Sequence, residues 1–225
     1  MSFELFDPAA EVRITYGHLP HWYQPGATYF VTFRTADSLP PEVADLLRRR
    51  RHDWLHRHGI DGDRPDWKIA LRKLSDGLQR DFDATFSREF LRALDKGHGA
   101  CPLRRRELAE TVSDSLRHFD GERYHLGDFV VMPNHVHLLV GLLGTTEIEA
   151  QCYSWKKFTA ASINRDLQQT GEFWQTESFD HLVRNAEQFD RIRRYIAQNG
   201  PQAGLSENEY LHWQRPLATT SSSST

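Results

Sequence analysis

Two histidines separated by a single valine form the most informative pattern in the chain. The segment Met132 to Val140 reads Met-Pro-Asn-His-Val-His-Leu-Leu-Val, with apolar residues on both sides. Residues two apart on a β-strand share a face, so His135 and His137 should project together while Val136 points into a core. Burying an imidazole without a partner costs ~1–3 kcal/mol. The pair therefore indicates either histidines satisfied within a core or a site for a divalent metal.

A tyrosine and an asparagine near the C-terminus form a second candidate group. Residues 187–199 carry apolar side chains at helical spacing, which predicts a helix that Gly200-Pro201 should end. Tyr195 and Asn199 are four residues apart and would share one face of that helix. A tyrosine hydroxyl can act as a nucleophile, and an amide oxygen suits a hard cation. The alternative is a half-buried tyrosine that only anchors the helix.

Several sequence blocks, taken in order, resemble the HUH single-tyrosine nucleases and, among them, the REP-associated tyrosine transposases. The resemblance is carried by Met-Pro-Asn-His-Val-His-Leu-Leu (132–139), Ser-Trp-Lys-Lys-Phe-Thr (154–159), Phe-Trp-Gln-Thr-Glu-Ser-Phe-Asp-His-Leu-Val-Arg (173–184) and Tyr-Ile-Ala-Gln-Asn-Gly-Pro-Gln-Ala-Gly-Leu (195–205). Gly-His-Leu-Pro-His-Trp (17–22) and Tyr-Phe-Val-Thr-Phe-Arg (29–34) look like the family's opening. The resemblance extends over most of the chain.

The resemblance implies a metal-dependent endonuclease and strand-transferase that cuts single-stranded DNA at hairpin-forming repeats. By position, Tyr195 would be the nucleophile that forms a covalent 5′-phosphotyrosine. His135, His137 and Asn199 would be the ligands of Mg²⁺ or Mn²⁺, and imidazole ligands favour Mn²⁺ of the two. Because the phosphotyrosine keeps the energy of the phosphodiester, rejoining needs no nucleotide cofactor.

The chain departs from the family pattern just after the tyrosine helix. The family usually continues Asn-Pro-Val-Lys-Ala-Gly-Leu, whereas residues 199–205 read Asn-Gly-Pro-Gln-Ala-Gly-Leu. The additional Gly200 is expected to shift the turn after Asn199, and glutamine replaces a lysine that could contact phosphate. Gln198 is an alternative amide ligand, although it lies off the face that carries Tyr195.

The order of expected elements predicts an α+β fold, the ferredoxin-like split βαββαβ with a central antiparallel sheet. The resemblance implies the same fold, with extra helices inserted after the first strand and a C-terminal tyrosine-bearing helix. Strands are expected at 27–35, 67–71, 123–132, 135–142 and 179–184, and helices at 40–58, 81–94, 103–119, 146–168 and 187–199. One domain should span 27–216 with an accessory insertion at about 49–96. Residues 1–26 should form an irregular N-terminal arm, and the low-complexity residues 217–225 a disordered tail.

Charge does not by itself announce a nucleic-acid partner, since the net charge is −3 and the pI is about 6.5. Positive residues are nevertheless clustered, as in Arg48–Arg51 and Arg104–Arg106, where a solvated helix face is the simpler explanation. Near the candidate site we expect phosphate contacts from Lys156, Lys157, Arg184, Arg191 and Arg194, with Arg193 beside them. Trp155, Phe158, Phe173 and Trp174 could stack on unpaired bases, but core packing is favoured for Phe158 and Trp174.

The remaining features narrow the class of protein. Two cysteines without metal spacing, no signal-peptide pattern and no apolar run of membrane-spanning length are consistent with the cytoplasm. The resemblance favours a monomer that acts in cis over a homodimer. A domesticated hairpin-DNA-binding protein without cleavage activity is the main alternative. A His-x-His metallohydrolase barrel would need a longer chain and an N-terminal histidine pair.

Overall fold

The computed structural model describes residues 3–16 and 20–216. The chain divides into two compact units, one formed by residues 37–101 and the other by the chain on either side of them. The unit formed by the chain before residue 37 and after residue 101 contains the main sheet and all of the candidate site residues. The predicted tail at 217–225 lies outside the described residues.

The main sheet has five antiparallel strands in the order β6-β3-β5-β4-β7. These strands are β3 (Thr28–Arg34), β4 (Tyr124–Met132), β5 (His135–Leu142), β6 (Phe179–Leu182) and β7 (Leu211–Trp213). Counted along the chain within this sheet, the strands β3 to β6 therefore lie in the order fourth, first, third, second. This is the arrangement of a split βαββαβ fold, and the predicted α+β class is confirmed.

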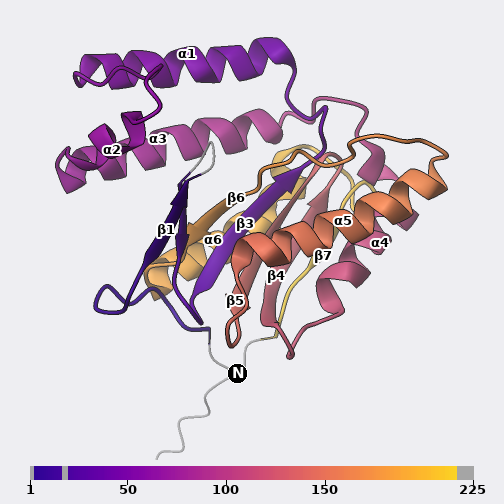
Figure 1. Cartoon of the computed structure of the whole chain (residues 1–225). Helices are drawn as coiled ribbons and strands as arrows, with labels where there is room; N and C mark the ends of the chain where they lie inside the picture. Colours follow the sequence, from indigo (N-terminus) through magenta and orange to yellow (C-terminus); the bar gives the residue numbers. More distant parts are fainter. Residues whose placement is uncertain (1–2, 17–19, 217–225) are drawn as a thin grey trace, which may run out of the picture. The chain divides into compact units, whose positions relative to one another are not determined.

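Helices cover both faces of this sheet (Figure 1). On one face lie α4 (Arg106–Arg117), which follows a short 3₁₀ turn at Pro102–Arg104, and α5 (Ile148–Asp166). The other face is covered by α6 (Ala186–Gln202). Val136, Leu138 and Val140 alternate along β5 and are fully buried in the core formed with α4 and α5. The histidines between them must therefore face α6.

The N-terminal segment is more regular than predicted. Instead of an irregular arm, β1 (Arg13–Tyr16) and β2 (Pro20–Tyr23) form an antiparallel two-stranded sheet. Both strands are rich in β-branched and aromatic residues, and a proline is tolerated at the first position of a strand. Pro20 begins β2, and Pro25 and Gly26 follow its end.

Residues 37–101 form a helical unit with its own core. It consists of α1 (Pro41–Arg57), α2 (Trp67–Arg72) and α3 (Asp76–Leu94), which pack around Trp54, Leu55, Ile60, Leu71 and Phe82. The predicted strand at 67–71 was wrong. Trp67 and Leu71 are four residues apart, so a helix turns both side chains toward this core. A strand at these residues would have no neighbouring strand to pair with among the described residues of this unit. The unit encloses the stretch that we expected to be an insertion.

The tyrosine helix α6 continues through Gly200-Pro201, contrary to the prediction, and ends at Gln202. Gly204 adopts φ 71°, and Leu205 N–H donates to Gly200 O at 3.1 Å while Gly204 N–H donates to Pro201 O at 3.0 Å. These two bonds form the Schellman motif that commonly ends a helix. A Cβ on Gly200 would collide with the ring of Tyr210. The additional glycine thus makes room for Tyr210 against the helix.

Candidate active site

The two histidines lie side by side on the buried face of β5 beneath α6. His135 is 1% exposed and His137 is fully buried. Their ring centroids are 4.5 Å apart. His137 pairs with Thr32 of β3 and with Val130 of β4, so it sits near the middle of the sheet, between its two hydrogen-bonded neighbours. The predicted common face of the two imidazoles is confirmed.

Helix α6 places Tyr195 against these histidines within one chain. The Tyr195 hydroxyl oxygen lies 3.2 Å from His137 Nε2, and the ring stands edge-on to Phe30 at a centroid distance of 6.0 Å. The helix begins with a side-chain cap, since Asn185 accepts a hydrogen bond from Gln188 N–H at 2.8 Å. The cap and the sheet contacts fix the position of the tyrosine along the helix axis.

Each of the two imidazole rings has a hydrogen-bond partner at its Nδ1. His135 Nδ1 lies 2.7 Å from the Asn134 side-chain oxygen, which can only accept, so Nδ1 holds the hydrogen and Nε2 keeps a lone pair. His137 Nδ1 lies 2.7 Å from the Thr32 hydroxyl. Partners of this kind orient metal-binding histidines. Asn134 adjoins the histidine motif, but Thr32 could be found only once the strand order was known.

The donor set at this site suits a divalent transition metal. Burial, and then the neighbouring His137, hold the pKa of His135 well below its usual 6.5, while a side-chain hydrogen bond with Asn199 acts in the opposite direction. The His135 imidazole is therefore available in the neutral form that binds metals. Asn199 is 2% exposed and supplies an amide group at the same place. Two imidazole nitrogens and one amide oxygen fit Mn²⁺ better than Mg²⁺.

An ion-pair network fastens the tyrosine helix to the sheet. Arg193 donates to both carboxylate oxygens of Asp128, at 2.8 and 3.1 Å, and to the carbonyl of Arg215 at 3.0 Å. Arg215 N–H also donates to Asp128 at 3.0 Å, and the Arg215 side chain pairs with Asp120. Asp128 is 1% exposed and lies in a register shift of β4 between Leu126 and Phe129. Arg193, which we expected beside DNA phosphates, is thus engaged with the buried Asp128.

We expect Asp128→Asn to lower the free energy of unfolding by roughly 3 kcal/mol, because it leaves the Arg193 guanidinium, which is only 15% exposed, without its counter-charge. Urea denaturation measures this. Glu110→Gln is the matched control, since its pair with Arg106 at 2.8 Å is exposed and should contribute less than about 0.5 kcal/mol. An equal effect of the two substitutions would contradict the structural role of Asp128.

The five basic residues predicted to contact DNA differ in their surroundings. Lys156 donates to the carbonyls of Gln175 and Thr176, at 3.2 and 2.6 Å, and burial lowers its pKa. The other four side chains belong to exposed residues: Lys157 on α5, Arg184 before α6, and Arg191 and Arg194 on α6. Arg191 pairs with Glu187 one turn earlier, at 3.2 Å. The α5 lysines lie on the helix that covers the opposite face of the sheet from the histidines.

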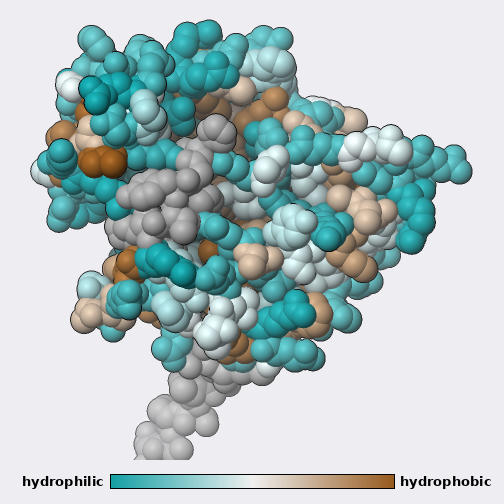
Figure 2. Space-filling view, in the orientation of Figure 1, coloured by the Kyte–Doolittle hydropathy of each residue, from teal (hydrophilic) through white to brown (hydrophobic). Residues whose placement is uncertain are grey.

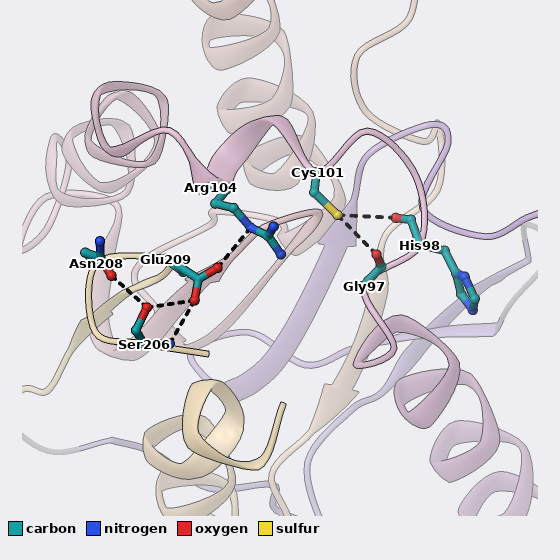
Figure 3. A network of polar contacts seen from close by, with 7 residues as sticks. All are labelled: Gly97, His98, Cys101, Arg104, Ser206, Asn208 and Glu209. Carbon is teal, nitrogen blue, oxygen red and sulfur yellow. Dashed lines mark hydrogen bonds and ion pairs between the residues drawn. The ribbon is translucent and has the colours of Figure 1, made fainter. Parts of the chain in front are cut away.

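Arginine runs elsewhere are largely engaged with acidic residues. Arg104 lies 3.4 Å from Glu209, whose carboxylate also accepts from the Ser206 backbone N–H and hydroxyl, at 3.0 and 2.7 Å (Figure 3). These hydrogen bonds, led by the backbone one, lower the pKa of Glu209. The loop after α6 is thereby tied to the 3₁₀ turn that precedes α4. Figure 3 also shows Cys101, which contacts the carbonyls of Gly97 and His98 within the unit 37–101.

His181 on β6 should make the protein sensitive to acid. Burial, and then the charge of Arg184, lower its pKa to about 4, and Gln188 donates to its Nε2 at 2.8 Å. The folded pKa of His181 lies below the unfolded value of about 6.5, so the unfolded chain binds a proton more readily. The free energy of unfolding should therefore be highest above pH 6.5 and fall as the pH falls toward 4. The loss should total roughly 3 kcal/mol and be absent in His181→Gln. Parallel unfolding curves of the two proteins across this range would exclude the effect.

The four candidate stacking aromatics also differ. Trp155, Phe173 and Trp174 are buried in the core, as predicted for Trp174. The core assignment of Phe158 was wrong, since this side chain is 61% exposed. Helix α5 turns Trp155 and Thr159 toward the sheet, and Phe158 therefore lies outside the buried stripe.

Comparison with known proteins supports the assignment from the motifs. Residues 104–199 match the family model described as "Transposase IS200 like". This segment contains both histidines, Tyr195 and Asn199. The match bears out, for residues 104–199, the transposase resemblance that the sequence blocks indicated.

Other comparisons add less. A solved structure of a REP-associated tyrosine transposase bound to a REP hairpin matches with 13% identity, covering 83% of this chain and 74% of that one at a TM-score of 0.44. The fold assignment accordingly rests on the strand order described above. No curated protein matches the chain. Among the described residues, no helix has the length and apolar character needed to cross a bilayer.

Proposed function

We propose that the protein is a metal-dependent transposase that cuts and rejoins single-stranded DNA through a covalent 5′-phosphotyrosine at Tyr195. The observation that carries the proposal is the contact between the Tyr195 hydroxyl and His137 Nε2, at 3.2 Å in a single chain. It lies in the segment that matches the IS200-like transposases. A tyrosine that only anchored its helix would not need a hydroxyl directed at a histidine pair.

The chain's own residues prepare the nucleophile. The hydroxyl oxygen of Tyr195 attacks the scissile phosphorus, a bond from this oxygen to phosphorus forms, and the bond to the 3′-oxygen breaks. The released 3′-oxygen takes a proton from water. Phe30 and the helix cap hold the tyrosine ring in place during this displacement.

His135, His137 and Asn199 would hold the metal ion, Mg²⁺ or Mn²⁺, which when bound supplies positive charge to polarise the scissile phosphate. His137 Nε2 lies 3.2 Å from the Tyr195 hydroxyl and is also the atom that would bind the ion, so the tyrosine proton would pass to water. Asn134 and Thr32 orient the two rings for this role.

Rejoining would use the same atoms in reverse. A free 3′-hydroxyl attacks the phosphotyrosine, the new phosphodiester forms, and the tyrosine oxygen leaves and regains a proton. Since the phosphotyrosine conserves the bond energy, the reaction is strand transfer without a nucleotide cofactor. Because Tyr195 and His137 meet within one chain, we propose that the tyrosine acts in cis.

Hairpin-forming single-stranded DNA is the proposed substrate, as the resemblance implies. Exposed Arg184, Arg191, Arg194 and Lys157 would contact its phosphates. The acidic net charge does not oppose this, because local rather than total charge sets the field at a binding site.

The test incubates the full chain and Mn²⁺ with labelled hairpin oligonucleotides taken from repeats that flank its gene. A labelled protein band that survives denaturation and requires the metal would support the proposal. Tight binding with neither adduct nor cut product, across several repeats and metals, would instead support a hairpin-DNA-binding protein that has lost cleavage.

A further inference from the structure

Helix α5 exposes two aromatic rings that the core does not use. Tyr153 is 63% exposed and Phe158 is 61% exposed, although Ile148, Cys152 and Trp155 of the same helix are buried. Large rings in water forgo the free energy that burial would give, on the order of 2 kcal/mol each. Over α5, residues of high and intermediate hydropathy reach the surface among hydrophilic ones (Figure 2). These two rings are therefore available to a ligand.

The spacing of the rings places a lysine between them. Five residues correspond to about 140° around a helix and about 7.5 Å along its axis, so the rings stand at the two sides of the exposed face. Lys157 lies between them, and its ammonium is 5.7 Å from the centroid of the Tyr153 ring. Alanine and serine occupy neighbouring exposed or partly exposed positions, at Ala150, Ser154, Ala161 and Ser162. The rings therefore stand out from a low surface.

The charge of this face favours an anionic ligand. From Tyr153 to Arg165 the sequence contains two lysines and one arginine and no acidic residue, while Glu149 lies one turn before Tyr153 and Asp166 follows Arg165. Lys156 is engaged with backbone carbonyls and Arg165 lies 3.6 Å from Asp166, which leaves Lys157 as the cation closest to the rings. Two separate rings also bury too little area for a stable protein interface, which needs about 1,200 Å² or more.

We propose that this face of α5 binds unpaired DNA, with one base stacked on Tyr153, a second on Phe158, and a phosphate between them on Lys157. Aromatic stacking of this kind tolerates any base, and the phosphate contact supplies the salt dependence. The site lies on the helix that covers the sheet face opposite the histidines, so it is separate from the site of cleavage. It rests on the proposed function only for its substrate, single-stranded DNA.

The test measures binding of the metal-free full chain to a fluorescent oligothymidylate by anisotropy, with a blunt duplex of equal length as the second probe. Tyr153→Ala and Phe158→Ala should each weaken single-strand binding about 5- to 100-fold. Tyr153→Phe and Phe158→Tyr should retain it, because the ring is kept. Lys157→Gln should reduce the salt slope of log K by about 0.7.

Ile69→Ala is the matched control, since this side chain is also large and 55% exposed but lies in the unit 37–101. This substitution should leave the affinity for the oligothymidylate and for the duplex unchanged. Single-strand affinity that stays at the control level in both alanine variants would overturn the proposal, as would an equal loss for duplex. If the alanine variants instead change only the sedimentation coefficient of the protein and not its DNA binding, the rings contact another protein and the proposal is overturned. If Tyr153→Ala and Phe158→Ala bind single strands as tightly as the unmodified protein and still form the covalent adduct, the α5 site is refuted and the proposed function stands.

Discussion

Tyr195→Phe should abolish covalent attachment of DNA and lower the rate of strand cleavage by at least about 10³-fold. The substitution removes only the hydroxyl that lies 3.2 Å from His137 Nε2. The ring that remains keeps its edge-on contact with Phe30, so the helix and the sheet should be undisturbed. The measurement is single-turnover cleavage of a labelled hairpin oligonucleotide in Mn²⁺, resolved on denaturing gels.

Tyr210→Phe is the control for this change. It removes a hydroxyl from a partly buried tyrosine whose ring packs at Gly200 near the end of the same helix, outside the histidine pair. Its cleavage rate should equal that of the unmodified protein. Residual adduct in Tyr195→Phe would identify another nucleophile and contradict the assignment.

Loss of a single histidine should have the second largest effect. We expect His135→Ala to weaken Mn²⁺ binding by more than about 100-fold, because losing a partner that merely orients a ligand already costs 10–100-fold. Cleavage should fall in parallel and not recover at saturating DNA. Isothermal titration with Mn²⁺ measures binding independently of activity.

His212→Ala serves as the comparison for the histidine substitution. His212 lies on β7 at the edge of the sheet, where partial burial lowers its pKa, and it is paired in register with Val130. Its loss should leave Mn²⁺ affinity unchanged. Equal Mn²⁺ affinity in His135→Ala and the unmodified protein would place the metal elsewhere.

Local patterns were sufficient to predict the elements that carry the site. Alternation around His135 and His137 identified a strand, and the apolar spacing around Tyr195 identified a helix, because both patterns are set by neighbours in the sequence. The end of that helix could not be predicted. Pro201 sits in the last turn, and the stop is Gly204, whose positive φ becomes apparent only in the folded backbone.

Long-range pairing explains what the sequence left open. Thr32 meets His137 only because β3 lies next to β5, and Arg193 finds Asp128 across 65 residues. Local polarity gave no sign that one arginine of α6 is engaged with the buried Asp128 while Arg194 beside it is exposed. The core prediction for Phe158 was wrong because aromatic residues at helical spacing are more often buried, whereas the orientation of α5 leaves this ring exposed.

The most direct test of the central claim is to digest the DNA–protein adduct formed in Mn²⁺ and map the modified peptide by mass spectrometry. The account predicts a nucleotide joined through its 5′-phosphate to Tyr195, with a free 3′-hydroxyl on the other DNA fragment. A nucleotide on any other residue, or a cut that leaves a 5′-phosphate in solution and no modified peptide, would contradict it.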